Sequence, residues 1–230
     1  MQEADEKTRA NGAGEGRIRA VLYDFDGTLA DSTELIMRCY RHTMRTHLGH
    51  CPPDEEWLRG FGTPLESQML RFAPGPAQVE AMLDTYRTYQ EELTDALMRP
   101  FPGAVETVAE LDRRGYRLAI ITSRRRRATM RGMELCGLVS HFDVIVTPED
   151  VTEAKPHPEP VLFALRELGV APREALFVGD SPHDVAAGRG AGTRTAGALW
   201  GPFPRAALEK ARPDALLNRQ QDVLSLLEKA

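Results

Sequence analysis

Two acidic residues, separated by one position, follow an apolar stretch near the start of the chain. Asp24 and Asp26 end the run Ile18–Phe25, and Gly27 comes directly after them. Two carboxylates at the end of a buried strand are costly unless a cation neutralises them, and hard cations such as Mg²⁺ prefer oxygen ligands. Gly27 permits a sharp turn or the close backbone approach that a phosphate requires. An Asx turn accounts for one acid, so the pair indicates a cation site.

A second pair of acids lies in the segment Gly179–Asp184. Asp180 closes a predicted strand, and Asp184 lies four residues on, one turn into the next helix and on the same face. One acid can reach a metal directly and the other through water. Asp180 or Ser181 as a helix N-cap, with Pro182 in the first turn, is an alternative that can hold at the same time. Four converging acids would repel one another without a cation.

Two hydroxyls and one lysine supply the polar groups that an anion needs. Thr122 and Ser123 lie between a predicted strand and a helix, where side-chain oxygens and backbone N–H groups bind anions, although both residue types are also ordinary helix caps. Lys155 is the single lysine between Lys7 and Lys210. Its compact ammonium suits a phosphate oxygen and an aspartate together. A surface lysine is the plainer alternative.

The elements that must position these residues alternate along the chain. We expect strands at 18–25, 116–122, 142–146, 175–179 and 193–199, with helices at 104–114, 125–136, 159–168 and 182–188. Such alternation predicts an α/β fold with a Rossmann-like, doubly wound parallel sheet. Ligands of these sheets bind beyond the carboxyl ends of the strands. The residues expected at those ends are Asp24, Asp26, Thr122, Ser123, Asp180 and Asp184.

A helical insertion separates the first strand from the others. Helical spacing recurs at Glu34–Thr46, Leu65–Phe72 and Ala77–Leu97, without a convincing strand. We therefore expect a core domain of residues 18–30 plus 100–230, and a small α-helical cap domain of residues 31–99. Residues 1–17 are polar and Gly-rich, which predicts a disordered tail.

Composition narrows the class of protein. A net charge of −5 argues against a nucleic-acid partner. No apolar run approaches the roughly 20 residues that cross a bilayer, and the first residues lack the apolar stretch of a signal peptide. Three cysteines without a CxxC pair fit a reduced, cytoplasmic setting. The sequence does not separate a monomer from a homodimer.

Four motifs, in this order, resemble those of the haloacid dehalogenase superfamily, most of whose members are magnesium-dependent phosphatases. They are the Asp-Phe-Asp-Gly-Thr run at 24–28, Thr122-Ser123, Lys155-Pro156 and the Gly-Asp-Ser-Pro-His-Asp run at 179–184. The resemblance spans Arg17 to Glu228, and the insertion is similar to the superfamily's small helical cap. More narrowly, Phe61–Leu65, Asp150–Val161 and Ala191–Gly201 resemble the branch of the bacterial pyrophosphatases and phosphoglycolate phosphatases.

The resemblance implies a role for each matching residue. Asp24 is the expected nucleophile, which forms an aspartyl phosphate, and Asp26 the expected acid and base. Thr122, the Ser123 N–H and Lys155 are expected to hold the phosphoryl oxygens. The expected Mg²⁺ ligands are Asp24, the carbonyl of Asp26, Asp180 and, in or near the second shell, Asp184. The expected substrate-binding residues are Ser123, Arg124, Gly27 and Gly62.

The same residues also indicate which other reactions of this superfamily the chain could catalyse. Dehalogenases generally lack the second acid of the first motif, so Asp26 argues against dehalogenation. Relatives that cleave phosphonates use a cap lysine, and residues 31–99 contain no lysine. A sugar phosphomutase stays possible, as does a non-catalytic module, although the intact motifs argue against the latter. Inorganic diphosphate is the expected substrate, with phosphoglycolate or another small phosphomonoester as the alternative.

Substrate choice is expected to lie in the cap. Four basic residues recur at helical spacing and either reach an anionic substrate or face solvent, namely Arg38, Arg41, His42 and Arg45. The loop Gly60–Leu65 is the best candidate to close over the site, because Gly60 and Gly62 give it mobility. In the run Arg124–Arg127, only Arg124 is expected near the site.

Overall fold

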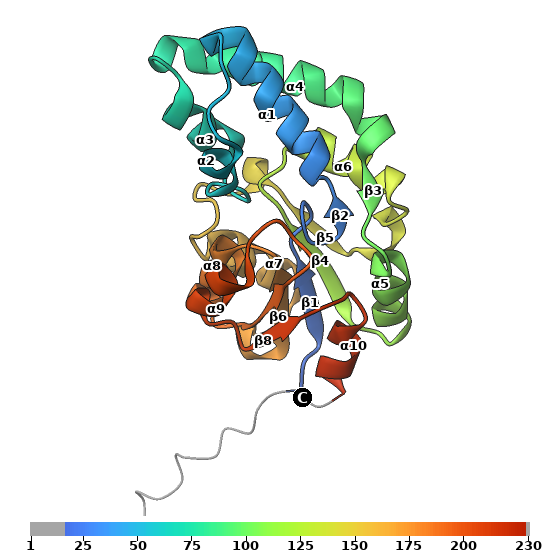
Figure 1. Ribbon diagram of the computed structural model, residues 1–230. Coiled ribbons are helices and arrows are strands. Elements are labelled where there is room, and N and C mark those ends of the chain that lie inside the picture. The colour runs from blue at the N-terminus through green and yellow to red at the C-terminus, as the bar shows by residue number, and fades with distance from the viewer. Residues whose placement is uncertain (1–16, 229–230) are drawn as a thin grey trace, which may run out of the picture.

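A six-stranded parallel sheet forms the centre of the protein. The computed structural model describes residues 17–228, so the predicted tail, apart from Arg17, lies outside the described residues. Across the sheet the strands are β5 (Val144–Val146), β4 (Arg117–Ile121), β1 (Ala20–Tyr23), β6 (Ala175–Gly179), β7 (Arg194–Ala198) and β8 (Ala215–Leu217). The order confirms the predicted doubly wound α/β fold, with β1 between two halves that run outward in opposite directions (Figure 1).

Side chains of the strands point alternately to two apolar layers. On β1, Ala20 and Leu22 join one buried cluster, while Val21 and Tyr23 join the other. The first cluster is completed by α7 (Glu159–Leu168) and α8 (Pro182–Ala191), and the second by α5 (Ala104–Arg113), α6 (Arg126–Leu135) and α10 (Asp222–Leu227). Helix α9 (Arg205–Ala211) packs beside α8. Covering both faces explains why these strands are almost wholly apolar.

The helical insertion lies between β1 and α5. It contains α1 (Thr33–Leu48), α2 (Asp54–Leu58), α3 (Leu65–Phe72) and α4 (Pro76–Leu97). A two-stranded antiparallel ribbon joins it to the sheet, with β2 (Ala30–Asp31) beside β3 (Arg99–Pro100). Figure 1 shows these four helices gathered at one end of the molecule, opposite α10 and the C-terminus.

The insertion has an aromatic centre of its own. Tyr40 stacks on Trp57 with ring centroids 4.7 Å apart, and Phe72 and Tyr86 also contact Trp57. This packing is continuous with the apolar layer under β1, because both belong to one buried cluster, which also contains Phe25, Leu29 and Met98. None of the described helices is long and apolar enough to cross a bilayer.

Three sequence-based boundaries need correction. The first strand covers only Ala20–Tyr23, because the carbonyl of Phe25 accepts three backbone N–H bonds and turns the chain. Helix α2 was not predicted, since five residues after Pro53 are too few for a periodic signal. Helix α8 continues three residues past Gly188 and ends at Gly192, whose φ is 81°. Gly188 therefore lies inside the helix, where glycine allows close packing because a Cβ would approach Thr195 to 2.6 Å.

Candidate active site

The turn after β1 places the first motif against the end of β6. The backbone N–H of Asp24 donates to the carbonyl of Val178, which keeps the carboxylate at the carboxyl edge of the sheet. Gly27 has a φ of 83°, and a Cβ there would lie 2.7 Å from Oδ2 of Asp180. Thr28 donates its hydroxyl to Oδ1 of the same carboxylate at 2.7 Å. Glycine is therefore needed for both the backbone conformation and the close approach of Asp180.

Three carboxylates converge at this edge. Ligand oxygens of Asp24, Asp180 and Asp184 all lie within 4.8 Å of one another, and the three residues are at most 2% exposed. Oδ2 of Asp180 has no hydrogen-bond partner among the described residues. Burial, reinforced by the neighbouring carboxylates, raises the pKa of Asp24 to about 7 and that of Asp180 well above its usual value. A buried, all-oxygen set with excess negative charge fits a hard divalent cation.

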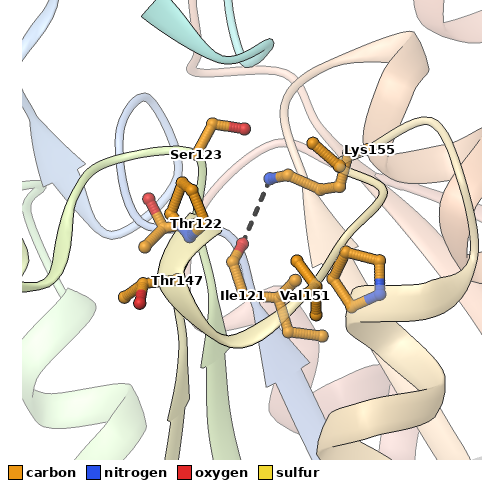
Figure 2. A pocket seen from close by; sticks show the side chains of 9 residues that line it. Ile121, Thr122, Ser123, Thr147, Val151 and Lys155 are labelled. Atoms are coloured by element: carbon orange, nitrogen blue, oxygen red, sulfur yellow. Dashed lines mark hydrogen bonds between the residues drawn. The ribbon is translucent and has the colours of Figure 1, made fainter.

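Lys155 is the buried counter-charge of this cluster. Its Nζ lies 2.9 Å from Oδ1 of Asp24 and 2.7 Å from Oδ1 of Asp184, and it donates to the carbonyl of Ile121 at 3.1 Å (Figure 2). Burial opposes its charge, but Asp184 and Asp24 together raise the pKa of Lys155 above its usual value. One ammonium balances only one of three carboxylates, so ionisation of all three requires a further cation.

Asp26 faces a different partner from Asp24. Arg124 donates Nε to Oδ2 and Nη2 to Oδ1 of Asp26, at 2.8 and 2.7 Å. Burial opposes ionisation of this carboxyl, but the guanidinium lowers the pKa of Asp26 below its usual value. The carboxylate of Asp26 is not part of the three-acid cluster. Sequence reasoning placed Arg124 near the site but missed this pairing.

The Thr122-Ser123 motif connects the sheet to the insertion. Ser123 donates its hydroxyl to the carbonyl of Gly62 at 2.6 Å, and a Cβ at Gly62 would lie 3.2 Å from Oγ of Ser181. The loop Gly60–Leu65 therefore reaches the carboxyl edge of the sheet. Figure 2 shows Thr122, Ser123 and Lys155 lining one small pocket at this edge.

The four basic residues of the insertion that were candidates for substrate binding line a separate hollow. An open hollow of about 370 Å³ is lined by residues of the insertion alone, namely Glu34, Arg38, Arg41, His42, Arg45, Thr46 and Tyr89. Arg38 pairs with Glu34, and Arg41 with Asp54. The geometry therefore favours the solvent-facing alternative for these side chains.

Ser181 caps α8, which confirms one of the N-cap alternatives predicted from the sequence, and it donates its hydroxyl to Asp184. Two supporting residues were not predicted from the sequence. Trp200 and Gln220 both donate to the carbonyl of Thr28, at 2.9 and 2.6 Å. Gln220 lies 192 positions away, and no local pattern marks such a contact.

Fold and site together define a class of enzyme. Residues 21–198 match the haloacid dehalogenase-like hydrolase family, and the chain belongs to that family. The predicted superfamily and the prediction of an enzyme are therefore confirmed.

More specific similarities lie within that family. The pyrophosphatase PpaX of Bacillus cereus is 39% identical over 211 residues, which cover 92% of this chain and 97% of the relative. A haloacid dehalogenase-like hydrolase from Streptococcus pneumoniae superposes with a TM-score of 0.79 at 28% identity, covering 91% of this chain and 98% of the other. A protein assigned as a phosphoglycolate phosphatase from Lactobacillus plantarum superposes with a TM-score of 0.81 at 26% identity, covering 91% of this chain and 99% of the other.

Proposed function

We propose that the protein is a phosphatase that depends on a divalent cation, with Asp24 as its nucleophile. The observation that carries the proposal is the carboxylate of Asp24, which is buried within an acidic cluster and lies 2.9 Å from Lys155. An uncompensated acidic cluster is unfavourable for stability, so a catalytic and cation-binding role explains it better than a structural one. Membership of the hydrolase family supports the same role.

The chain's own residues divide the reaction into two displacements. Oδ of Asp24 attacks phosphorus, the bond from phosphorus to the leaving oxygen breaks, and an aspartyl phosphate forms. Asp26 enters the cycle protonated and gives this proton to the leaving oxygen, then regains one from the water that splits the aspartyl phosphate. Lys155, the hydroxyl of Thr122 and the N–H of Ser123 hold the phosphoryl oxygens, with Arg124, Gly27 and Gly62 next to the bound substrate.

Mg²⁺ is the cation that we propose. Its ligands would be Asp24, Asp180 and the carbonyl of Asp26, with Asp184 beside them. When bound, it supplies positive charge that offsets both the carboxylates and the phosphoryl group.

Inorganic diphosphate is the substrate that we propose. The 39% identity to PpaX over nearly all of both chains supports this choice. Phosphoglycolate or another small phosphomonoester is the second candidate, supported by the similarity to the Lactobacillus plantarum protein. We also propose that residues 31–99 act as the cap of a core formed by 18–30 and 100–230, and that the enzyme works in the cytoplasm, where its three unpaired cysteines would stay reduced.

The test is a phosphate-release screen with and without Mg²⁺. It compares diphosphate, phosphoglycolate and sugar phosphates, with Asp24→Asn as control. We expect diphosphate to be hydrolysed fastest, and only with the cation. Preferred release from sugar phosphates would refute the diphosphate assignment alone. Conversion of a β-hexose 1-phosphate to the 6-phosphate without phosphate release would replace the hydrolase with a mutase. Absence of release from every compound would favour a non-catalytic module.

A further inference from the structure

Arg124 is the buried member of an otherwise exposed run of arginines. Its side chain is 4% exposed, whereas those of Arg125, Arg126 and Arg127 are 62%, 44% and 89% exposed. The exposed three pair with surface acids. Burying a guanidinium is costly unless it is paired, so the position of Arg124 calls for a specific role.

The contact with Asp26 uses the planar fork of the guanidinium. Nε and Nη2 each donate to a different oxygen of the carboxylate, at 2.8 and 2.7 Å, so the carboxylate is fixed in both position and plane. The backbone of Arg124 is held as well. Its N–H donates to Oγ1 of Thr122, and its carbonyl accepts from Oγ1 of Thr129. The end of β4 and the start of α6 therefore determine where Asp26 points.

The insertion covers this ion pair. Burial raises the pKa of Cys39 in α1 and of Tyr86 in α4, and the charge of Arg124 nearby opposes both shifts. Nη1 of Arg124 is buried without a hydrogen-bond partner among the described residues. With water excluded, an ion pair is stronger than the same contact on the surface.

We propose that Arg124 is a positioning residue that holds the carboxyl group of Asp26 for proton transfer under the closed insertion. The inference rests on the acid–base role proposed for Asp26. It differs from the substrate-binding role expected from the sequence, because two of the three guanidinium nitrogens are engaged by Asp26. A residue that binds substrate affects KM for every substrate. A residue that positions the general acid affects kcat/KM most where the leaving group needs a proton, because this constant covers the step in which the leaving group departs.

Leaving-group dependence therefore tests the inference. The variants Arg124→Gln, Arg124→Lys, Asp26→Asn and the double variant Asp26→Asn/Arg124→Gln are assayed with Mg²⁺ on alkyl phosphates, phenyl phosphate and 2,4-dinitrophenyl phosphate. We expect Arg124→Gln to lower kcat/KM about 10- to 100-fold on the poor leaving groups and less than about threefold on dinitrophenyl phosphate. The double variant should be no slower than Asp26→Asn, and Arg124→Lys should recover part of the loss because it keeps the charge. Arg127→Gln, from the exposed part of the run, is the matched control and should behave as the unmodified chain.

Two outcomes overturn the inference. They are an equal loss of kcat/KM on all three substrates, or a double variant slowed by the product of the two single effects. Arg124→Lys keeps the test valid if Arg124→Gln folds poorly, since a positioning role predicts leaving-group dependence for it too. If Asp26→Asn itself shows no leaving-group dependence, its acid–base role fails and the inference falls with it. If Asp26→Asn shows leaving-group dependence but Arg124→Gln does not, the positioning role of Arg124 is wrong and the proposed function stands.

Discussion

Nζ of Lys155 lies 2.9 Å from Oδ1 of Asp24, and both side chains are 3% exposed or less. Among the described residues, this buried ammonium is also bound to Asp184 and to the carbonyl of Ile121. The proposed nucleophile Asp24 and the ammonium of Lys155 are therefore held together by contacts that also involve Ile121 of β4 and Asp184 of α8.

Replacing Lys155 with methionine is expected to cost both stability and activity. The substitution leaves Asp24 and Asp184 buried without their cation, and removal of one partner from a buried ion pair typically costs about 3–5 kcal/mol. Denaturant unfolding without divalent cation measures this loss. The exposed Lys210→Met is the matched control, and equal unfolding free energies for the two variants would contradict the prediction.

Asn in place of Asp24 is expected to separate activity from stability. Turnover should fall at least about 10³-fold, because the nucleophile is lost. Without cation, stability should rise by about 4 kcal/mol near pH 8, because an acid whose folded pKa is raised destabilises the protein when ionised. The pKa of Asp24 is raised from 3.8 to about 7, so the gain should grow between these pH values and be small at pH 4.

Thermal or denaturant unfolding from pH 4 to 8 measures that gain. Asp84→Asn, at an exposed site of α4, is the control and should show no such pH dependence. A stability difference for Asp24→Asn that is constant across this range would refute the electrostatic explanation.

Binding of Mg²⁺ is expected to release protons. Burial raises the pKa of Asp24 to about 7 and that of Asp180 well above its usual value, so Asp24 holds a proton over much of the range up to pH 7 that a bound cation displaces. Titration calorimetry in buffers of different ionisation enthalpy counts the protons, and the melting temperature should rise with the cation. Asp180→Asn should weaken both effects. Heat that does not vary with the buffer would argue against cation binding at this cluster.

Alanine at Gly27 is expected to weaken cation binding more than it weakens the fold. Gly27 and Gly49 have similar positive φ values of 83° and 73°, so alanine at either costs about 1 kcal/mol in backbone strain. Only at Gly27 would the new Cβ meet the carboxylate of Asp180, whereas nothing lies within 4 Å at Gly49. We therefore expect Gly27→Ala to bind Mg²⁺ at least about tenfold more weakly and Gly49→Ala to bind normally. Equal affinities would disprove the steric argument.

From the sequence, we could predict which residues lie together at the carboxyl edge of the parallel sheet. Asp24 and Asp180 could be placed at one site because strand ends share an edge, although 156 positions separate them. Lys155 was assigned to the same site through the motifs that resemble those of the family. The pairing of Arg124 with Asp26 could not be foreseen, because four successive arginines differ only in their angle around the start of α6. The same limit applies to Gln220, whose contact with Thr28 depends on tertiary packing. Elements β8, α9 and α10 are three to seven residues long, too short for a decisive periodic signal.

The ribbon of β2 and β3 has a consequence for engineering. Ala30 lies opposite Pro100 and Asp31 opposite Arg99, so the chain leaves and rejoins the sheet at neighbouring points. A foreign helical segment with similarly spaced ends can therefore be grafted at one two-point junction without altering the order of the strands. Such a chimera must also match the apolar surface of Phe25, Leu29 and Met98. Such a chimera would test the proposal that the insertion determines substrate preference while the core carries the hydrolytic chemistry.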